Sequence, residues 1–465
     1  MVTFLTPRLH NSNLVGKEEA TDRGDQKRSM EEMLKLTHLL VTVFLYTFAT
    51  MTAFPAIPDV TMSALCPGRD ECSLAIYFTG FQQVVTGVGA LLMVPLLGNL
   101  SDKFGRKTVL TIPLILNVIP LGILGYGRSR DLFYIYFVFK CVTSIVCEGS
   151  VQCLAVAYAA DNVPEHRRAS AFGILSAIIS SASVCGNLCA RFLSISSTFQ
   201  AAASTAAMAA LYMRVFLTDS ASNCNFSAPL LSGENVESVS SKKEKYASAL
   251  PSLTDLFSFL KTSSTFSQAA VVAFFSNLAD VGHHASIMYY LKAKFHFDKD
   301  RIADLMVISG FLPSNESLQL LLTPILVPVL GENRLLSVGV FFNCLHMLLH
   351  SLAWSEWVSY GAAMFSVLYI FWQPCLQSIV SKQVGASEQG KAQGCISGIS
   401  SFANVVSPFV FSPLTALFLS ENAPFYFPGF SIMCAASAAM IAFVQSMMIK
   451  TPAKACTSIH VEVLV

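Results

Sequence analysis

Long apolar runs alternate with short polar segments along most of the chain. Each run is 19 to 29 residues long, enough for a helix that crosses a bilayer, which needs about 20 residues. Backbone groups inside lipid must be satisfied within their own segment, so these runs predict transmembrane helices. There are twelve of them, near 36–57, 74–97, 108–126, 132–160, 169–190, 198–217, 266–291, 303–329, 335–353, 357–380, 392–418 and 425–449.

A polar stretch separates the first six runs from the last six and contains "SVSSKKEKYASALPS". This composition is typical of a linker that is disordered in part. We therefore predict an all-α membrane protein with twelve transmembrane helices in two pseudo-symmetric six-helix bundles. The predicted parts are a cytosolic N-terminal tail (1–35), an N-terminal bundle (36–217), a cytosolic linker (218–264), a C-terminal bundle (265–449) and a cytosolic C-terminal tail (450–465).

Composition agrees with a multi-pass membrane protein. Of 465 residues only 13% are charged, against about a quarter in soluble proteins. The net charge of +1, without a basic stripe, excludes a nucleic-acid partner, and the lipid bilayer is the expected surrounding. The polar N-terminal stretch lacks the apolar segment of a signal peptide, so we expect no cleaved leader.

The distribution of Lys and Arg predicts the orientation. With the N-terminus in the cytosol, the cytosolic segments carry 21 basic residues and the opposite loops carry 8. Such an excess predicts that the N-terminus and the C-terminus both lie in the cytosol. Four bases run against this assignment, at Lys292, Lys294, Lys299 and Arg301. The membrane is either the plasma membrane or an internal one, and we expect a monomer.

The two halves resemble each other in their polar loops. "RRASAFGILSA" matches "QGKAQGCISGI" at an offset of 221 residues, and "FGRKTVL" matches "LGENRLL" at an offset of 226. The second match pairs Gly105 with Gly331 and Arg106 with Glu332. Repeated six-helix units are common in secondary transporters, which bind solute between the halves near the bilayer midplane.

The loop after the second run, "GNLSDKFGRK", is the most specific motif. It resembles the major facilitator superfamily signature G-x-L-x-D-x-x-G-R-[KR], matching at Gly98, Asp102, Gly105, Arg106 and Lys107 as well as at the leucine. "YAADNVPEHRRASAFG" and "EQGKAQG" resemble loops of the drug:proton antiporter branch. The chain is similar to the tetracycline-resistance and hippocampus abundant transcript proteins.

The resemblance implies a conformational role for this loop. Its glycines permit a sharp reversal, and the two bases hold it at the cytosolic face. In the family the acid at the place of Asp102 meets a helix end of the other half and stabilises one access state. The second copy has Pro328 at the corresponding position, so we expect this contact on one side only. The fifth run, with "GNLCA", lacks the antiporter G-P-x-x-G pattern, which leaves the transport direction open.

Ionisable residues inside spans are costly and usually face a cavity or a partner. Asp280 lies within "FSNLADVGHHASIMYY", and His283 and His284 follow on the same helix face. The antiporter group commonly has an acid there, which implies a role in proton coupling or solute contact. The alternative is that Asp280 only hydrogen-bonds a neighbouring helix.

Two further candidates, Lys140 and Glu148, lie in the fourth run. An unbroken helix separates them by about 12 Å and about 80°, so we expect no direct pair. Glu148 is the rival coupling acid, and Lys140 could attract an anionic solute. Glu316, next to Pro313, is a weaker candidate that could satisfy free backbone groups there.

No metal site is predicted. His346 and His350 share a helix face, but we find no third ligand near them in the sequence and interpret them as packing or hydrogen-bonding residues. Cys66 and Cys72 fall in the first non-cytosolic loop, where a disulfide can form, and their pairing is left open. The acceptor patterns at Asn225 and Asn315 fall in the linker and in a span, so we expect no glycosylation.

No phosphate-binding loop or nucleophile elbow occurs, so we expect neither an enzyme nor a cofactor. The sequence therefore predicts a secondary transporter of a small organic solute, driven by protons through alternating access. Two alternatives stay open. One is an uncoupled facilitator or importer, and the other is a receptor or scaffold that keeps the fold without transport.

Overall fold

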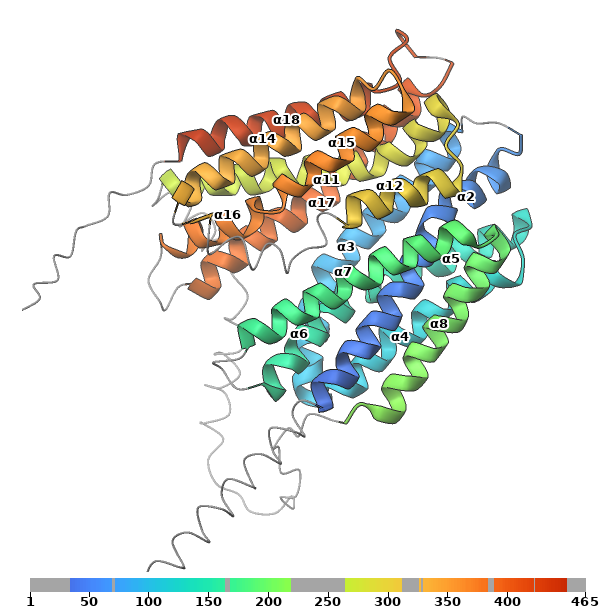
Figure 1. The fold of residues 1–465 in the computed structure, drawn as a ribbon. Helices are drawn as coiled ribbons and strands as arrows, with labels where there is room; N and C mark the ends of the chain where they lie inside the picture. The colour runs from blue at the N-terminus through green and yellow to red at the C-terminus, as the bar shows by residue number, and fades with distance from the viewer. Residues whose placement is uncertain are drawn as a thin grey trace, which may run out of the picture. The chain divides into compact units, whose positions relative to one another are not determined.

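The structure is a computed structural model and describes residues 34–68, 72–163, 168–218, 264–311, 326–327, 329–383, 389–421 and 423–449 (Figure 1). All regular secondary structure in these ranges is helical. The elements are a helix over 34–53, η1 (Phe54–Ala56), α2 (Ile57–Leu65), α3 (Ser73–Phe104), α4 (Arg106–Tyr126), α5 (Arg130–Cys147), α6 (Ser150–Asn162), α7 (Arg168–Phe192), α8 (Ile195–Phe216), α11 (Ser264–Phe295), α12 (Lys299–Phe311), α14 (Glu332–Ser351), α15 (Glu356–Tyr369), α16 (Trp372–Ser381), α17 (Gln389–Phe418) and α18 (Phe430–Met448).

The helices fall on the twelve predicted runs. The eighth run is described only in part, and the predictions for Asn225, Asn315, Glu316 and Pro328, with most of the linker, lie outside the described residues. Within the described ranges, seven helices are long and apolar enough to cross a membrane by length and composition alone. The other segments carry more polar residues, are shorter, or break at a turn.

Contacts divide the chain into two units. The first comprises residues 1–75, 85–229 and 296–317, and the second comprises 76–84, 230–295 and 318–465. Part of α3 is thus grouped with the second unit, and α12 with the first. The predicted bundle boundaries at 217 and 265 follow chain order alone, and they stay a prediction.

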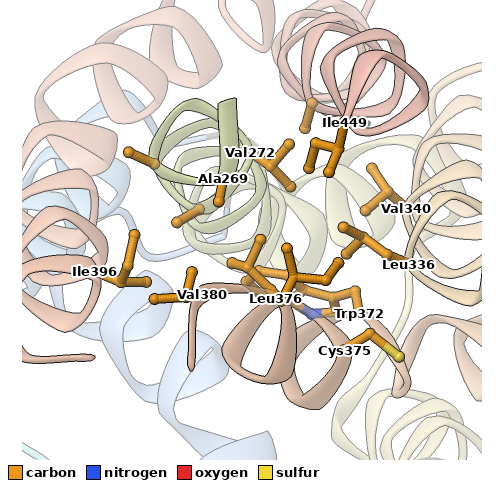
Figure 2. Packing of buried hydrophobic residues seen from close by; sticks show 14 of the residues in the cluster. Ala269, Val272, Leu336, Val340, Trp372, Cys375, Leu376, Val380, Ile396 and Ile449 are labelled. Atoms are coloured by element: carbon orange, nitrogen blue, oxygen red, sulfur yellow. The ribbon is translucent and has the colours of Figure 1, made fainter. Parts of the chain in front are cut away.

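Each unit has its own apolar core. In the first, Leu110 and Leu114 of α4 pack with Leu154 and Tyr158 of α6 and with Met213 of α8. Figure 2 shows the core of the second unit, where side chains of α11, α14 and α16 converge. Helix α18 packs on α11 and α14 through a row of buried alanines. Small side chains let helices approach closely, which is how helices associate where lipid removes the hydrophobic driving force.

The described surfaces of both units carry many exposed large apolar side chains. Water would disfavour so much apolar surface, whereas acyl chains match it.

The fourth helix of each half is broken, which the sequence analysis did not predict. Helix α5 ends at Cys147, and Gly149, with φ of 73°, precedes α6. Between α15 and α16 the chain turns at Ile370 and Phe371. Gly149 and Ile370 are 221 positions apart, the offset at which the loops after these helices match. The breaks therefore belong to the repeated unit.

Candidate functional site

The basic turn between α3 and α4 is built on Gly105. Its φ of 87° lies in the left-handed region that favours glycine. Arg106 follows, and its Nε donates to the Asp161 carboxylate at 2.9 Å. Its Nη1 donates to the Gly98 carbonyl at 3.4 Å and to the Ser101 hydroxyl. One guanidinium thus joins the start of α4 to the end of α3 and to the end of α6.

The remaining motif residues have local positions only. Lys107 lies in the first turn of α4, where its carbonyl accepts the Thr111 hydroxyl at 2.8 Å. Asp102 lies near the end of α3, and its side chain is outside the described structure. The role predicted for its carboxylate stays a prediction.

The second copy of the turn has the same backbone with opposite charge. Gly331 has φ of 81° and precedes α14, as Gly105 precedes α4. The next residue is Glu332, whose carboxylate accepts from Lys382 at 2.6 Å and from the Ser378 hydroxyl at 2.7 Å. Acid thus replaces base at the start of the helix, and base replaces acid at its partner.

The sequence offsets relate the two ion pairs. Arg106 and Glu332 are 226 positions apart, and Asp161 and Lys382 are 221 positions apart. These are the offsets at which the polar loops match. The repeat therefore keeps the link between its third and fourth segments while reversing the charges, which Glu332 alone could not indicate in the sequence.

Asp280 is held by two neutral donors in the second unit. The Asn343 amide of α14 donates to one carboxylate oxygen at 2.8 Å, and the Tyr369 hydroxyl of α15 donates to the other. Asp280 is half-buried, and Asn343 is buried. Among the described residues we find no cation paired with this carboxylate. Sequence reasoning missed both donors because uncharged polar residues in a span are too common to single out.

His283 points toward a different set of partners from Asp280. Its Nε2 lies 3.3 Å from Nδ1 of His350, and its ring centroid lies 4.8 Å from that of His346. The other ring nitrogen of His350 also has a partner, since Nε2 donates to the Ser359 carbonyl at 3.2 Å. The neighbouring His284 has an exposed side chain.

This cluster corrects the sequence analysis, which found no third ligand beside His346 and His350. The structure brings His283 to them, so that one donor atom from each ring lies within 4.8 Å of the others. The cluster joins residues of two helices that are far apart in the chain, so no short sequence spacing of ligands predicts it. The only local signal is the pair of histidines four residues apart.

Lys140 and Glu148 are not brought together. Lys140 is half-buried on α5, and Glu148 is exposed at the break before α6. The unbroken-helix geometry used to separate them is wrong, because α5 ends one residue before Glu148. No contact between the two side chains is found in the described residues. They stay candidates without a shared site.

Two of the four bases that oppose the charge rule cap helix ends. Lys299 is buried, and its Nζ donates to the carbonyls of Ala190 and of Leu193 (at 2.7 Å) at the end of α7. Lys294 Nζ donates to the Ala353 carbonyl at 2.6 Å, just beyond α14. A cation favours the negative end of a helix, so these two have structural roles that explain their place.

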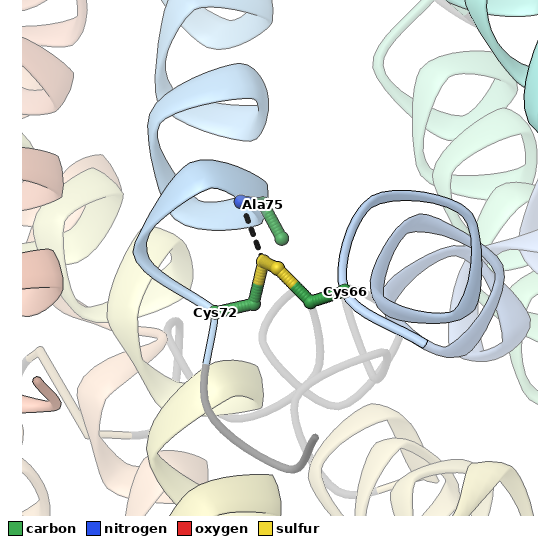
Figure 3. Close-up of a disulfide and its surroundings, with 3 residues drawn as sticks. All are labelled: Cys66, Cys72 and Ala75. Atoms are coloured by element: carbon green, nitrogen blue, oxygen red, sulfur yellow. Dashed lines mark hydrogen bonds between the residues drawn. A yellow bond between two sulfur atoms is a disulfide. The ribbon is translucent and has the colours of Figure 1, made fainter. Parts of the chain in front are cut away.

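The open question of the loop cysteines is answered by the structure. Cys66 and Cys72 form a disulfide, and Cys72 Sγ accepts from the Ala75 amide at the start of α3 (Figure 3). The bridge ties the end of α2 to the start of the next span.

Comparison with known sequences identifies relatives over most of the chain. The Major Facilitator Superfamily profile matches residues 39–408. Hippocampus abundant transcript-like protein 1 of Homo sapiens is 25% identical over 345 residues, covering 74% of this chain and 64% of the relative. Hippocampus abundant transcript 1 protein of Homo sapiens is 23% identical, covering 74% and 66%. The chain thus spans about two thirds of these relatives. Tetracycline resistance protein class E of Escherichia coli is 22% identical, covering 72% and 80%.

Solved structures of similar fold are transporters. A D-xylose-proton symporter superimposes with a TM-score of 0.67 at 14% identity, covering 91% of this chain and 98% of the other. The nucleoside transporter NupG gives 0.60 at 15%, covering 90% and 100%. A human organic anion transporter gives 0.57 at 15%, covering 89% and 99%. These identities show the fold alone, and the predicted all-α membrane fold is confirmed.

Proposed function

Because this chain belongs to the major facilitator superfamily, we propose that it moves a small organic solute by alternating access and couples that movement to protons at Asp280. The chain is a multi-pass integral membrane protein of a transporter family, and the family is not one of enzymes. Proton coupling, the solute class, a monomeric state and cytosolic termini belong to the proposal.

The observation that carries the proposal is the pair of donors on Asp280. A reversible proton site must offer hydrogen-bond partners to both forms of the carboxyl group. Tyr369 donates to the carboxylate, and by turning its hydroxyl it can accept from the protonated acid. An amide side chain such as Asn343 likewise carries both a donor and an acceptor. Neither protonation state leaves the acid unpartnered.

The geometry also explains why Asp280 is preferred over its rival. An intramembrane acid without a cation keeps the freedom to bind and release a proton as its surroundings change. Glu148 has an exposed side chain at the helix break before α6. The relay predicted for His283 loses support, since that ring contacts His350 and His346.

The test is uptake into proteoliposomes with and without an inward or outward pH gradient. The probes are a labelled organic anion, a nucleoside and a pentose, the solute types named for the structures of similar fold. We expect a pH gradient to drive one probe above equilibrium. Equal flux with and without the gradient would make the protein a facilitator. No flux of any solute would favour the receptor or scaffold.

The residue assignment is tested with two matched neutral variants. Asp280→Asn should abolish accumulation yet leave exchange down a solute gradient, because an amide mimics the protonated acid but releases no proton. Glu148→Gln should accumulate solute like the unmodified protein. The reverse outcome would place coupling on the fourth helix. Gel filtration and thermal unfolding of both variants separate loss of coupling from loss of fold.

A further inference from the structure

Three imidazoles meet in the second unit, away from the carboxylate that the proposed function uses. His283 comes from α11, and His346 and His350 come from α14. His283 and His350 are buried, and His346 is half-buried. Burying polar rings costs free energy unless they find partners.

A hydrogen-bond network accounts for only part of this cluster. Protonated on Nε2, His283 can donate to Nδ1 of His350, which in turn donates through Nε2 to Ser359. That chain leaves out His346, for which we find no hydrogen bond within the described residues, although its ring centroid lies 4.6 Å from that of His350. A partner shared by all three rings would account for the whole cluster.

From this geometry we propose that His283, His346 and His350 bind a divalent transition metal ion, with Zn²⁺ as the best fit. Imidazole nitrogen suits Zn²⁺, Cu²⁺ and Ni²⁺, whereas Mg²⁺ and Ca²⁺ prefer oxygen. Two histidines four residues apart on a helix are a common part of zinc sites. Three protein ligands leave one of the four tetrahedral positions of Zn²⁺ open.

The distances fit such an ion. A tetrahedral zinc with bonds to nitrogen of about 2.0–2.1 Å places its nitrogens about 3.3 Å apart. The His283 and His350 nitrogens are 3.3 Å apart, and all three donor atoms lie within 4.8 Å. Binding an ion would bring the wider separations, which are 4.8 Å at most, toward the same value.

A contact outside the cluster prepares His350 for the role. Metal-binding histidines usually donate their second ring N–H to a carbonyl or carboxylate, which fixes the tautomer and the ring plane. Here Nε2 donates to the Ser359 carbonyl of α15, so Nδ1 keeps its lone pair and faces the other two rings. This contact favours metal binding over a cluster formed by packing.

The experiment uses the full chain, purified in detergent, stripped with a chelator and titrated with ZnCl₂ by calorimetry. The triple variant His283→Gln, His346→Gln, His350→Gln measures background binding by other side chains. We expect one ion per chain above that background. Each single glutamine variant should lose affinity by more than the 10–100-fold typical of losing an outer partner. The matched control is His284→Gln, the adjacent exposed histidine, which should keep the affinity.

X-ray absorption at the zinc edge of the unmodified protein gives a second test that needs no variant to fold. We expect nitrogen neighbours at about 2.0–2.1 Å with the signature of imidazole, whereas sulfur at about 2.3 Å would assign the ion to cysteines. The proposal is overturned by sulfur coordination, by equal binding in the triple variant, or by equal loss in the control. None of these outcomes depends on transport, so failure here leaves the proposed function untouched.

Discussion

The reversed ion pair at the two turns predicts that charge can be exchanged between the copies. We consider Arg106→Glu with Asp161→Lys, which gives the first half the acid and base that the second half carries as Glu332 and Lys382. The single change Arg106→Glu places two carboxylates at the position of a 2.9 Å contact. The added Asp161→Lys restores opposite charges there.

The expected magnitude follows from the exposure and contacts of each pair. Arg106 is 15% exposed and Asp161 is 40% exposed, so their coupling free energy should be about 1 kcal/mol, at the upper end for surface pairs. Lys382 is 62% exposed, which lowers the expectation for its pair with Glu332 to about 0.5 kcal/mol. The exchanged pair leaves the acceptors at Gly98 and Ser101 without the guanidinium, at about 1 kcal/mol for each lost hydrogen bond.

The measurement is a double-mutant cycle on the free energy of unfolding, from denaturant titration of the purified protein in detergent. The exchanged pair should be more stable than Arg106→Glu alone and less stable than the unmodified protein. If the single and the exchanged variants unfold at the same free energy, the ion pair contributes nothing. The reversal between the copies would then have no energetic meaning.

Three further predictions concern the motif, the topology and the packing. Asp102→Asn should slow solute flux in proteoliposomes at normal expression, because the acid tunes the balance of access states; unchanged flux would show that the motif has lost this role. Cysteine-accessibility labelling should reach a probe in the segment 218–264 only from the cytosol, and labelling only from outside would reverse the topology. Gly282→Ala should destabilise the protein by about 1–3 kcal/mol, since a Cβ there would lie 2.3 Å from Phe411, whereas the control Gly361→Ala meets nothing within 4 Å.

The sequence predicted where the helices lie, because bilayer thickness sets the length of each apolar run. The breaks at Gly149 and Ile370 escaped prediction, since each lies inside an apolar run that is long enough to be one continuous helix. Fold and turn motif were thus accessible from one chain, but the local geometry of the fourth helices was not.

Of the candidate site, the sequence analysis found the charged residue and missed its neutral partners. Asp280 stands out in any span, whereas Asn343 and Tyr369 become meaningful only when α14 and α15 pack beside it. The histidine cluster needed the same packing. Contacts between helices far apart in the chain are set by tertiary packing, and a single sequence carries no signal for them.

Comparing corresponding positions of the two halves shows where the polar residues of the second half differ from those of the first. At the offset of 226, Asn343 corresponds to Asn117, and both amides are buried. Asn117 donates to the Thr50 hydroxyl in the first helix of its half, at 3.4 Å. Asn343 donates to Asp280 in the first helix of its own half. The same amide contact therefore meets a neutral group in one copy and an acid in the other.

The histidines follow the same pattern. The offset of 226 places His346 on Pro120 and His350 on Leu124, so the first half has no nitrogen ligand where the second has two. A repeat constrains backbone geometry, as Gly105 and its counterpart show, but it does not constrain which copy carries ionisable groups. Since burying such groups is costly, their concentration on α11 and α14 is expected only if they have a function there. Proton coupling and metal binding are therefore both to be sought in the second unit, and variants of the first should change stability and access more than they change either activity.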